Sequence, residues 1–151
     1  MKSFVGKIVM LILAIVVVLQ FIPVKRTNPA VIADKDLINV THPDKEVADL
    51  IKAACYDCHS HETVWPWYSY VAPVSWVVSN HVVDARDELN FSEWTDYDAE
   101  KMDHKLEECE EALTEGWMPD ESYLRMHEEA KLTDEQRKLL IKFFVELRGS
   151  L

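Results

Sequence analysis

Two cysteines three positions apart, with a histidine directly after the second, stand in the segment Cys55-Tyr56-Asp57-Cys58-His59. A chain with this segment brings two thiols and one imidazole to the same place. Two thiols one helical turn apart can form thioethers with the two vinyl groups of a haem, and the adjacent imidazole can then reach the iron. The spacing therefore predicts one haem c, attached covalently through Cys55 and Cys58, with His59 as an iron ligand.

Three other uses of these cysteines compete with haem attachment. A thiol–disulfide motif uses Cys55 and Cys58 alone, but such motifs begin a helix after a strand, whereas here a helical pattern ends at the pair. A zinc site could add Cys109 and either His59 or His61, yet no second C-x-x-C or H-x-x-x-H completes it. A plain structural disulfide is the simplest alternative. We favour haem attachment, which leaves Cys109 as a buried free thiol.

The first 26 residues, MKSFVGKIVMLILAIVVVLQFIPVKR, combine a basic start with a long apolar run. As a helix, the stretch from Phe4 to Val24 would be about 31 Å long, close to the ~30 Å hydrocarbon core of a bilayer. No small-residue cleavage site follows it, so we expect a single transmembrane anchor rather than a cleaved signal peptide. The flanking charges do not decide its orientation. Because haem is joined to thiols outside the cytoplasm, we expect an inner-membrane protein with its C-terminal domain in the periplasm.

The charge of the chain is distributed unevenly. Residues 1–26 hold four of the 16 Lys and Arg residues and none of the 27 Asp and Glu residues, so the other 125 residues carry 12 basic and 27 acidic groups, a formal net charge of −15. Such a surface repels nucleic acid and attracts a basic surface on another protein. We therefore expect redox protein partners with a basic docking surface, and no nucleic acid.

Helical spacing dominates the chain from Pro43 onward, and no segment shows the alternation of a strand. The pattern predicts helices from about residue 43 to the cysteine pair, over 73–89, over 98–115 and over 133–147, the last starting with a capping box of Thr133 and Gln136. We expect an all-α fold in three parts: an anchor (1–26), an extended tether (27–42) and a small cytochrome c-like helical domain around one haem (43–151). Residues expected to face inward include His81, Met102, Leu106, Cys109, Leu113, Leu139, Leu140, Phe143 and Leu147.

The ligand on the second face of the iron is not determined by spacing. Met118 lies in a loop after Gly116 and before Pro119, and a methionine ligand raises the reduction potential. His81 lies on an otherwise aliphatic helix stripe, where a buried imidazole needs a partner. Met118 is the first candidate, His81 is the second, and an open sixth position is the third.

Aromatic side chains are expected to form a core that includes the porphyrin. A backbone carbonyl of Pro66 or Pro73 is expected to accept a hydrogen bond from the second nitrogen of His59. The aromatic residues concerned, of which the first three are expected to contact haem, are Trp65, Trp67, Tyr68, Trp76 and Trp94.

Four stretches carry a resemblance to a known family. They are CYDCHS at 55–60, WPWY at 65–68, NFSEW at 90–94 and GWMPDESY at 116–123. Together they resemble the bacterial haem-binding domain family, short c-type cytochrome-like proteins with an N-terminal anchor, over roughly residues 40–147. The resemblance implies a covalent haem with His59 as its proximal ligand. Asp120 departs from the pattern, where a second proline is expected.

These features predict a membrane-anchored periplasmic monohaem protein that transfers single electrons. We do not expect an enzyme, because no acid–base pair suited to the distal side of a haem is recognisable. The alternative is a haem-based sensor or ligand-binding module with an exchangeable sixth ligand, although the sequence contains no output domain. The two differ in whether the sixth position of the iron can be displaced.

Overall fold

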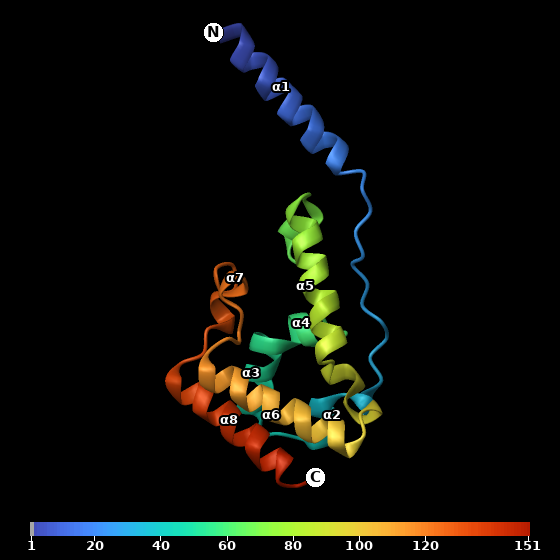
Figure 1. Cartoon of the computed structure of the whole chain (residues 1–151). Helices are drawn as coiled ribbons and strands as arrows, with labels where there is room; N and C mark the ends of the chain where they lie inside the picture. Colours follow the sequence, from blue (N-terminus) through green and yellow to red (C-terminus); the bar gives the residue numbers. More distant parts are fainter. Residues whose placement is uncertain (1) are drawn as a thin grey trace.

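The computed structural model describes residues 2–151, which form a helical body with the N-terminal helix projecting away from it (Figure 1). No strand occurs among these residues, and the prediction of an all-α fold is confirmed. In chain order the elements are α1 (Lys2–Leu19), η1 (Ala33–Lys35), α2 (Leu37–Thr41), α3 (Lys45–Ile51), η2 (Lys52–Tyr56), α4 (Asp57–His59), η3 (Trp67–Tyr70), α5 (Val74–Glu88), η4 (Phe91–Asp96), α6 (Ala99–Glu115), α7 (Glu121–Leu124), η5 (Glu128–Ala130) and α8 (Asp134–Arg148).

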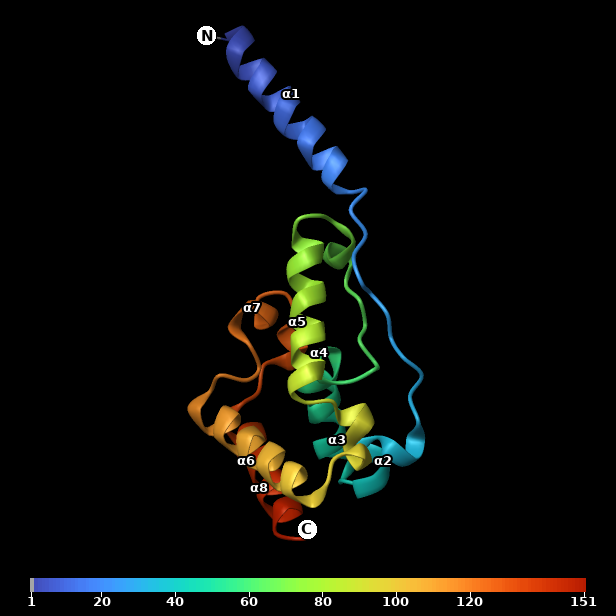
Figure 2. The same cartoon turned by 45° about the vertical axis from the view of Figure 1, so that its right-hand side comes forward.

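The base of the body is the pair α6 and α8, which lie side by side in both views (Figures 1 and 2). Each helix places apolar residues three, four or seven positions apart on the face toward its partner, as an amphipathic helix must to bury one stripe. The inward prediction for Leu106, Leu113 and Leu140 is confirmed, and Phe144, which was not predicted, is buried as well. The core contains Leu37, Val47, Ile51, Tyr56, Phe91, Trp94, Leu106, Leu113, Leu140 and Phe144.

The ends of α6 and α8 follow the predicted capping signals. The Asp98 side chain accepts a hydrogen bond from the Lys101 amide at the start of α6, and Gly116 ends that helix in the left-handed conformation (φ 79°), which glycine adopts without strain. The capping box of Thr133 and Gln136 at the start of α8 is present in both directions. These two boundaries agree with the predicted ones.

Helix α1 is shorter than predicted. It ends at Leu19 rather than Val24, because Pro23 disfavours helical backbone before it and Gln20 turns back to donate a hydrogen bond to the Val16 carbonyl (2.7 Å). Within the described part of the chain, no helix combines the length and the apolar character needed to cross a membrane. The prediction of a transmembrane helix is therefore not confirmed.

The segment predicted as an extended tether is partly folded and is held against the body. It contains η1 and α2, and Asp36 at the start of α2 accepts hydrogen bonds from the Asn39 amide and from the Tyr56 hydroxyl (3.1 and 3.2 Å to the two carboxylate oxygens). Leu37 is fully buried in the core. Helices this short leave no periodic pattern, and for that reason the sequence did not reveal them.

Helix α5 buries only part of the predicted inner stripe: Val82 is buried as expected, but Val74, Val77 and His81 are exposed. Its buried residues are Ser75, Ser79 and Val82, whereas His81 is exposed. The N-terminal segment runs along this face, where the Ser79 hydroxyl donates to the Lys25 carbonyl (2.5 Å). Small side chains allow the backbone to approach closely, so the serine face is covered and the prediction that His81 is buried is wrong.

Candidate cofactor site

The two cysteines and His59 lie at the C-terminal end of one continuous helical stretch. Helix α3 runs into the π-type turn η2, which holds Cys55, and then into α4, which holds Cys58 and His59. Turns of π type inside helices are frequently found at functional sites. All three side chains are partly accessible, and both cysteines are free thiols. The structure therefore brings these three predicted site residues together on adjoining turns.

Both thiols are protonated at neutral pH. Burial raises the pKa of Cys55 to about 12, and the neighbouring Cys58 adds to the rise. Burial raises the pKa of Cys58 to about 11, with further contributions from the carboxylates of Asp57 and Asp120. Reactive redox cysteines have a lowered pKa, since the thiolate is the nucleophile. The environment of this pair is the opposite of the one that thiol–disulfide exchange requires.

The imidazole of His59 is oriented by the C-terminal end of α5. Its Nδ1 lies 3.1 Å from the Ala85 carbonyl oxygen and 3.1 Å from the Leu89 carbonyl oxygen. Carbonyls only accept hydrogen bonds, so Nδ1 carries the proton and Nε2 keeps its lone pair. Burial lowers the pKa of His59, with the two carbonyls opposing the shift, and the ring is neutral at pH 7. A neutral imidazole oriented through its other nitrogen is the form that binds a metal.

The prediction that a carbonyl of Pro66 or Pro73 orients His59 is wrong. Neither Pro66 nor Pro73 contacts Nδ1; the acceptors come from the last turn of α5 and the residue after it. The Ala85 carbonyl also accepts the Leu89 amide (2.8 Å), and its second lone pair is available to the imidazole, while Leu89 follows the last residue of the helix. No local pattern in the sequence identifies this contact, because the partners are 26 and 30 residues apart.

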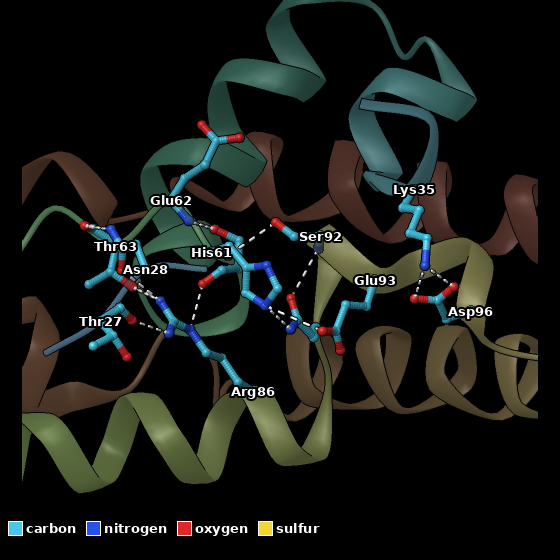
Figure 3. Close-up of polar contacts among 12 residues, drawn as sticks. Thr27, Asn28, Lys35, His61, Glu62, Thr63, Arg86, Ser92, Glu93 and Asp96 are labelled. Carbon is cyan, nitrogen blue, oxygen red and sulfur yellow. Dashed lines mark hydrogen bonds and ion pairs between the residues drawn. The ribbon is translucent and has the colours of Figure 1, made fainter. Parts of the chain in front are cut away.

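Arg86, next to Ala85 in the chain, ties the loop after His59 to the N-terminal segment (Figure 3). Its guanidinium donates to the Ser60 carbonyl (2.7 Å) and the Thr63 hydroxyl (2.7 Å) on one side. On the other it donates to the Thr27 carbonyl (2.8 Å) and the Asn28 side-chain oxygen (2.9 Å). All four acceptors are neutral. These four hydrogen bonds, here named the Arg86 clamp, join the two segments to α5. The sequence analysis did not single out this residue.

His61 is buried beside the same loop, as Figure 3 shows. Its backbone amide donates to the Ser92 hydroxyl (3.0 Å), and its Nε2 lies 2.9 Å from the side-chain nitrogen of Asn90 and 3.5 Å from a carboxylate oxygen of Glu93. Among the described residues its Nδ1 has no partner. His61 therefore joins the loop after His59 to Asn90 and η4.

A second group of rings connects the Met118 loop to α4. The Tyr123 hydroxyl donates to a carboxylate oxygen of Asp57 (2.8 Å), and the Tyr123 ring stacks on His127 with centroids 4.1 Å apart. The Tyr68 hydroxyl lies 2.8 Å from Nε2 of His127. Burial and the Asp57 contact raise the pKa of Tyr123, so its hydroxyl stays protonated. Helix α7 is thereby held beside Asp57, one of the two residues between the cysteines.

The two candidate distal ligands lie on different elements. Met118 is exposed in the loop between α6 and α7, where Arg137 donates to its carbonyl oxygen (3.0 Å). His81 is exposed on α5, one turn before Ala85. Helix α5 packs against α4, which holds Cys58, and the carboxylate of Asp120 in the other loop contributes to the raised pKa of Cys58. Hydrogen bonds from Ser122 and Tyr123, together with the charge of His81, lower the pKa of Asp120 in the Met118 loop.

The aromatic residues predicted to form one cluster lie in several environments. The Trp65 indole donates to the Asn28 side chain (3.2 Å), and Trp67 is 72% exposed. Trp94 is buried in the core, as predicted. The indole nitrogen of Trp76 is buried without a partner among the described residues. Of the three predicted haem contacts, Tyr68 is thus the one that joins the group of rings formed by Tyr123 and His127.

The sequence matches the Haem-binding domain family over residues 14–146, which is most of the chain. No curated protein and no solved structure matches it. The donor set fits a haem, because His59 presents a neutral imidazole whose Nε2 has no hydrogen-bond partner within residues 2–151, next to two free thiols. The chain belongs to the haem-binding domain family, and haem is its cofactor.

Proposed function

We propose that this protein binds one haem c covalently through Cys55 and Cys58, with His59 as the proximal iron ligand. The observation that carries the proposal is the orientation of His59, whose Nδ1 is occupied by two carbonyls while Nε2 remains free. Two neutral, unpaired thiols on the adjoining turn support it, because a vinyl group adds to a thiol that is not already in a disulfide or bound to zinc.

We propose Met118 as the sixth ligand. The carbonyls of Ala85 and Leu89 contact Nδ1 of His59. The nitrogen available to iron, Nε2, therefore lies on the side of the ring away from the C-terminal end of α5. His81 belongs to α5 itself, whereas Met118 belongs to a separate loop. Arg137 of α8 binds this loop at the Met118 carbonyl, and the contact of Tyr123 with Asp57 joins the following helix α7 to α4. This difference favours Met118 over His81.

We propose one-electron transfer as the activity, with no substrate turned over. A haem held between a histidine and a methionine supplies an iron that changes oxidation state with both ligands in place. The role of the chain is then to hold His59 in one tautomer and to cover the site with the Met118 loop. Partners are redox proteins with a basic surface, because residues 27–151 carry a formal net charge of −15.

We propose a periplasmic location with attachment to the inner membrane through the N-terminal segment. Covalent attachment of haem outside the cytoplasm is the reason for the location. The apolar side chains of α1 from Phe4 onward are exposed, because the helix projects away from the body. Such an exposed apolar surface supports the attachment. A single crossing of the membrane by this segment stays a prediction.

The absorption spectrum of the purified protein, reduced and then exposed to carbon monoxide, tests the proposed activity. An electron-transfer protein with two protein ligands keeps its low-spin spectrum, because carbon monoxide has no free position on the iron. A rapid shift of the spectrum on adding carbon monoxide would instead support the alternative, a haem-based sensor with an exchangeable sixth ligand.

A further inference from the structure

The end of α1 is fastened to the corner where η3 meets α5. The Gln20 side chain forms two hydrogen bonds with Ala72, donating to its carbonyl (3.3 Å) and accepting from its amide (3.0 Å). The Arg26 guanidinium donates to the Ser69 carbonyl (2.9 Å) and lies 4.5 Å from the centre of the Tyr70 ring. Figures 1 and 2 agree that the N-terminal end of α5 is the part of the body nearest α1. The body is therefore held close to α1 at this corner.

This corner exposes a group of apolar side chains, here named the tip surface. Trp67 and Tyr70, which are 72% and 59% exposed, are three residues apart in the 3₁₀ turn η3 and so project to the same side. Phe21, two residues after the end of α1, is 83% exposed. The tip surface consists of Phe21, Ile22, Trp67, Tyr70, Val71 and Val74.

The tip surface is also the part of the chain without negative charge. Residues 1–33 and 63–83 contain no Asp or Glu, although the chain has 27 of them. Lys25 and Arg26 flank the surface and can extend their charged ends toward lipid phosphates while their stems stay in the apolar layer. Trp and Tyr, with apolar rings and one polar group, are enriched where membranes meet water. Elsewhere on the body the excess of carboxylates opposes approach to a membrane.

We propose that the tip surface is a lipid-binding surface that enters the headgroup layer of the bilayer beside α1. The haem-binding body is then held at a fixed height and orientation on the membrane rather than moving freely on a tether. The proposal rests on the membrane attachment proposed above. It adds which face of the body contacts lipid and why that face is free of acidic residues.

Photocrosslinking of the full-length haem-loaded protein in phosphatidylcholine vesicles tests this surface. Separate variants carry benzoylphenylalanine in place of Trp67, of Ile12 in α1, or of Val145. Val145 is an exposed apolar residue on α8, at the opposite end of the body from α1, and serves as the matched control. After illumination, mass spectrometry identifies lipid adducts, and the visible spectrum of each sample confirms that haem is bound.

We expect lipid adducts at positions 12 and 67 and none at position 145. Adducts at 12 without adducts at 67 overturn the lipid-binding surface and leave the membrane attachment standing. Adducts at neither position overturn both. Crosslinks from position 67 to a second copy of the protein, without lipid adducts there, assign the tip surface to self-association and also contradict the proposal. A haem-free spectrum in every variant, whatever the adducts, contradicts the proposed function alone.

Discussion

Arg86 joins segments near the cofactor site that lie far apart in the sequence. Its guanidinium donates to Thr27 and Asn28 in the N-terminal segment and to Ser60 and Thr63 in the loop after His59. Its neighbour in the chain, Ala85, provides one of the carbonyls that orient His59. The position of the proximal imidazole and the path of the N-terminal segment therefore depend on the same turn of α5.

Replacement of Arg86 should destabilise the protein measurably. Arg86→Gln removes hydrogen bonds from a charged donor, two of them to the part-buried acceptors on Ser60 and Thr63, so we expect the free energy of unfolding to fall by about 2 kcal/mol. Urea denaturation followed by circular dichroism measures it. Arg125→Gln is the control, because Arg125 makes an exposed i,i+4 pair with Glu121 (3.1 Å) and such pairs contribute about 0.3–0.5 kcal/mol. Equal losses in the two variants would mean that the four-way contact does not stabilise the fold.

Replacement of Met118 and of His81 distinguishes the two candidate sixth ligands. Met118→Ala should abolish the weak far-red absorption of a sulfur-ligated ferric haem, lower the reduction potential and admit carbon monoxide to the reduced protein. His81→Ala should leave all three unchanged, since His81 is an exposed residue on the helix that orients His59. Absorption spectra and a potentiometric titration provide the readouts. If only His81→Ala changes them, the haem has two histidine ligands.

At the scale of elements, replacement of Thr133 tests whether the capping box at the N-terminus of α8 stabilises the protein. The Thr133 hydroxyl accepts from the Gln136 amide (3.2 Å), and the Gln136 side chain accepts from the Thr133 amide (2.9 Å). Thr133→Ala should lower the free energy of unfolding by about 1 kcal/mol. Thr114→Ala, at an exposed position within α6, should cost nothing, because alanine has the higher helix propensity. Chemical denaturation of both variants measures the difference. An unchanged free energy of unfolding in Thr133→Ala would show that the cap does not stabilise the protein.

The contact between α6 and α8 should depend on pH through Asp103. Arg148 donates to both carboxylate oxygens of Asp103 (2.7 and 3.0 Å), and this hydrogen bonding, with the charge of Arg148, lowers the pKa of that carboxyl. A lowered folded-state pKa adds stability above the unfolded pKa, and that stability is lost as the pH falls through the folded value. Asp103→Asn should therefore lower the melting temperature at pH 6, and the difference from the native protein should shrink below about pH 4.

Glu146→Gln is the matched control for this pH dependence. It removes the same charge from α8, where Glu146 is 3.7 Å from Lys142 in an exposed pair. Its melting temperature should follow that of the native protein from pH 6 downward. A constant deficit for Asp103→Asn across the whole pH range would show that the residue contributes packing rather than an ion pair.

The sequence predicted those elements and site residues whose signals are local. The cysteine–histidine motif, the cap at Thr133 and the end of α6 at Gly116 each depend on a few consecutive residues, and the structure has the two helix boundaries where the pattern placed them. The inner face of α5 was predicted only in part: Val82 is buried, but the N-terminal segment covers Ser75 and Ser79 rather than the side that carries His81.

The contacts that organise the whole molecule join residues far apart in the chain and could not be predicted from spacing. The Arg86 clamp spans 23 to 59 residues, and the Tyr123 contact with Asp57 spans 66. In the resulting molecule, α5 runs from the corner that contacts the end of α1 to the carbonyls that orient His59 (Figure 2). Attachment and cofactor orientation therefore share one helix in this account.

Intact-mass spectrometry of the denatured protein tests the central claim most directly. The protein is produced in a bacterial host that attaches haem to thiols in the periplasm, and its mass is compared with those of Cys55→Ala/Cys58→Ala and Cys109→Ala. We predict that the native protein and Cys109→Ala each retain the mass of one haem after denaturation, while the double variant has the mass of the polypeptide alone. A native protein that loses its haem on denaturation, or a double variant that keeps it, would contradict covalent attachment through Cys55 and Cys58.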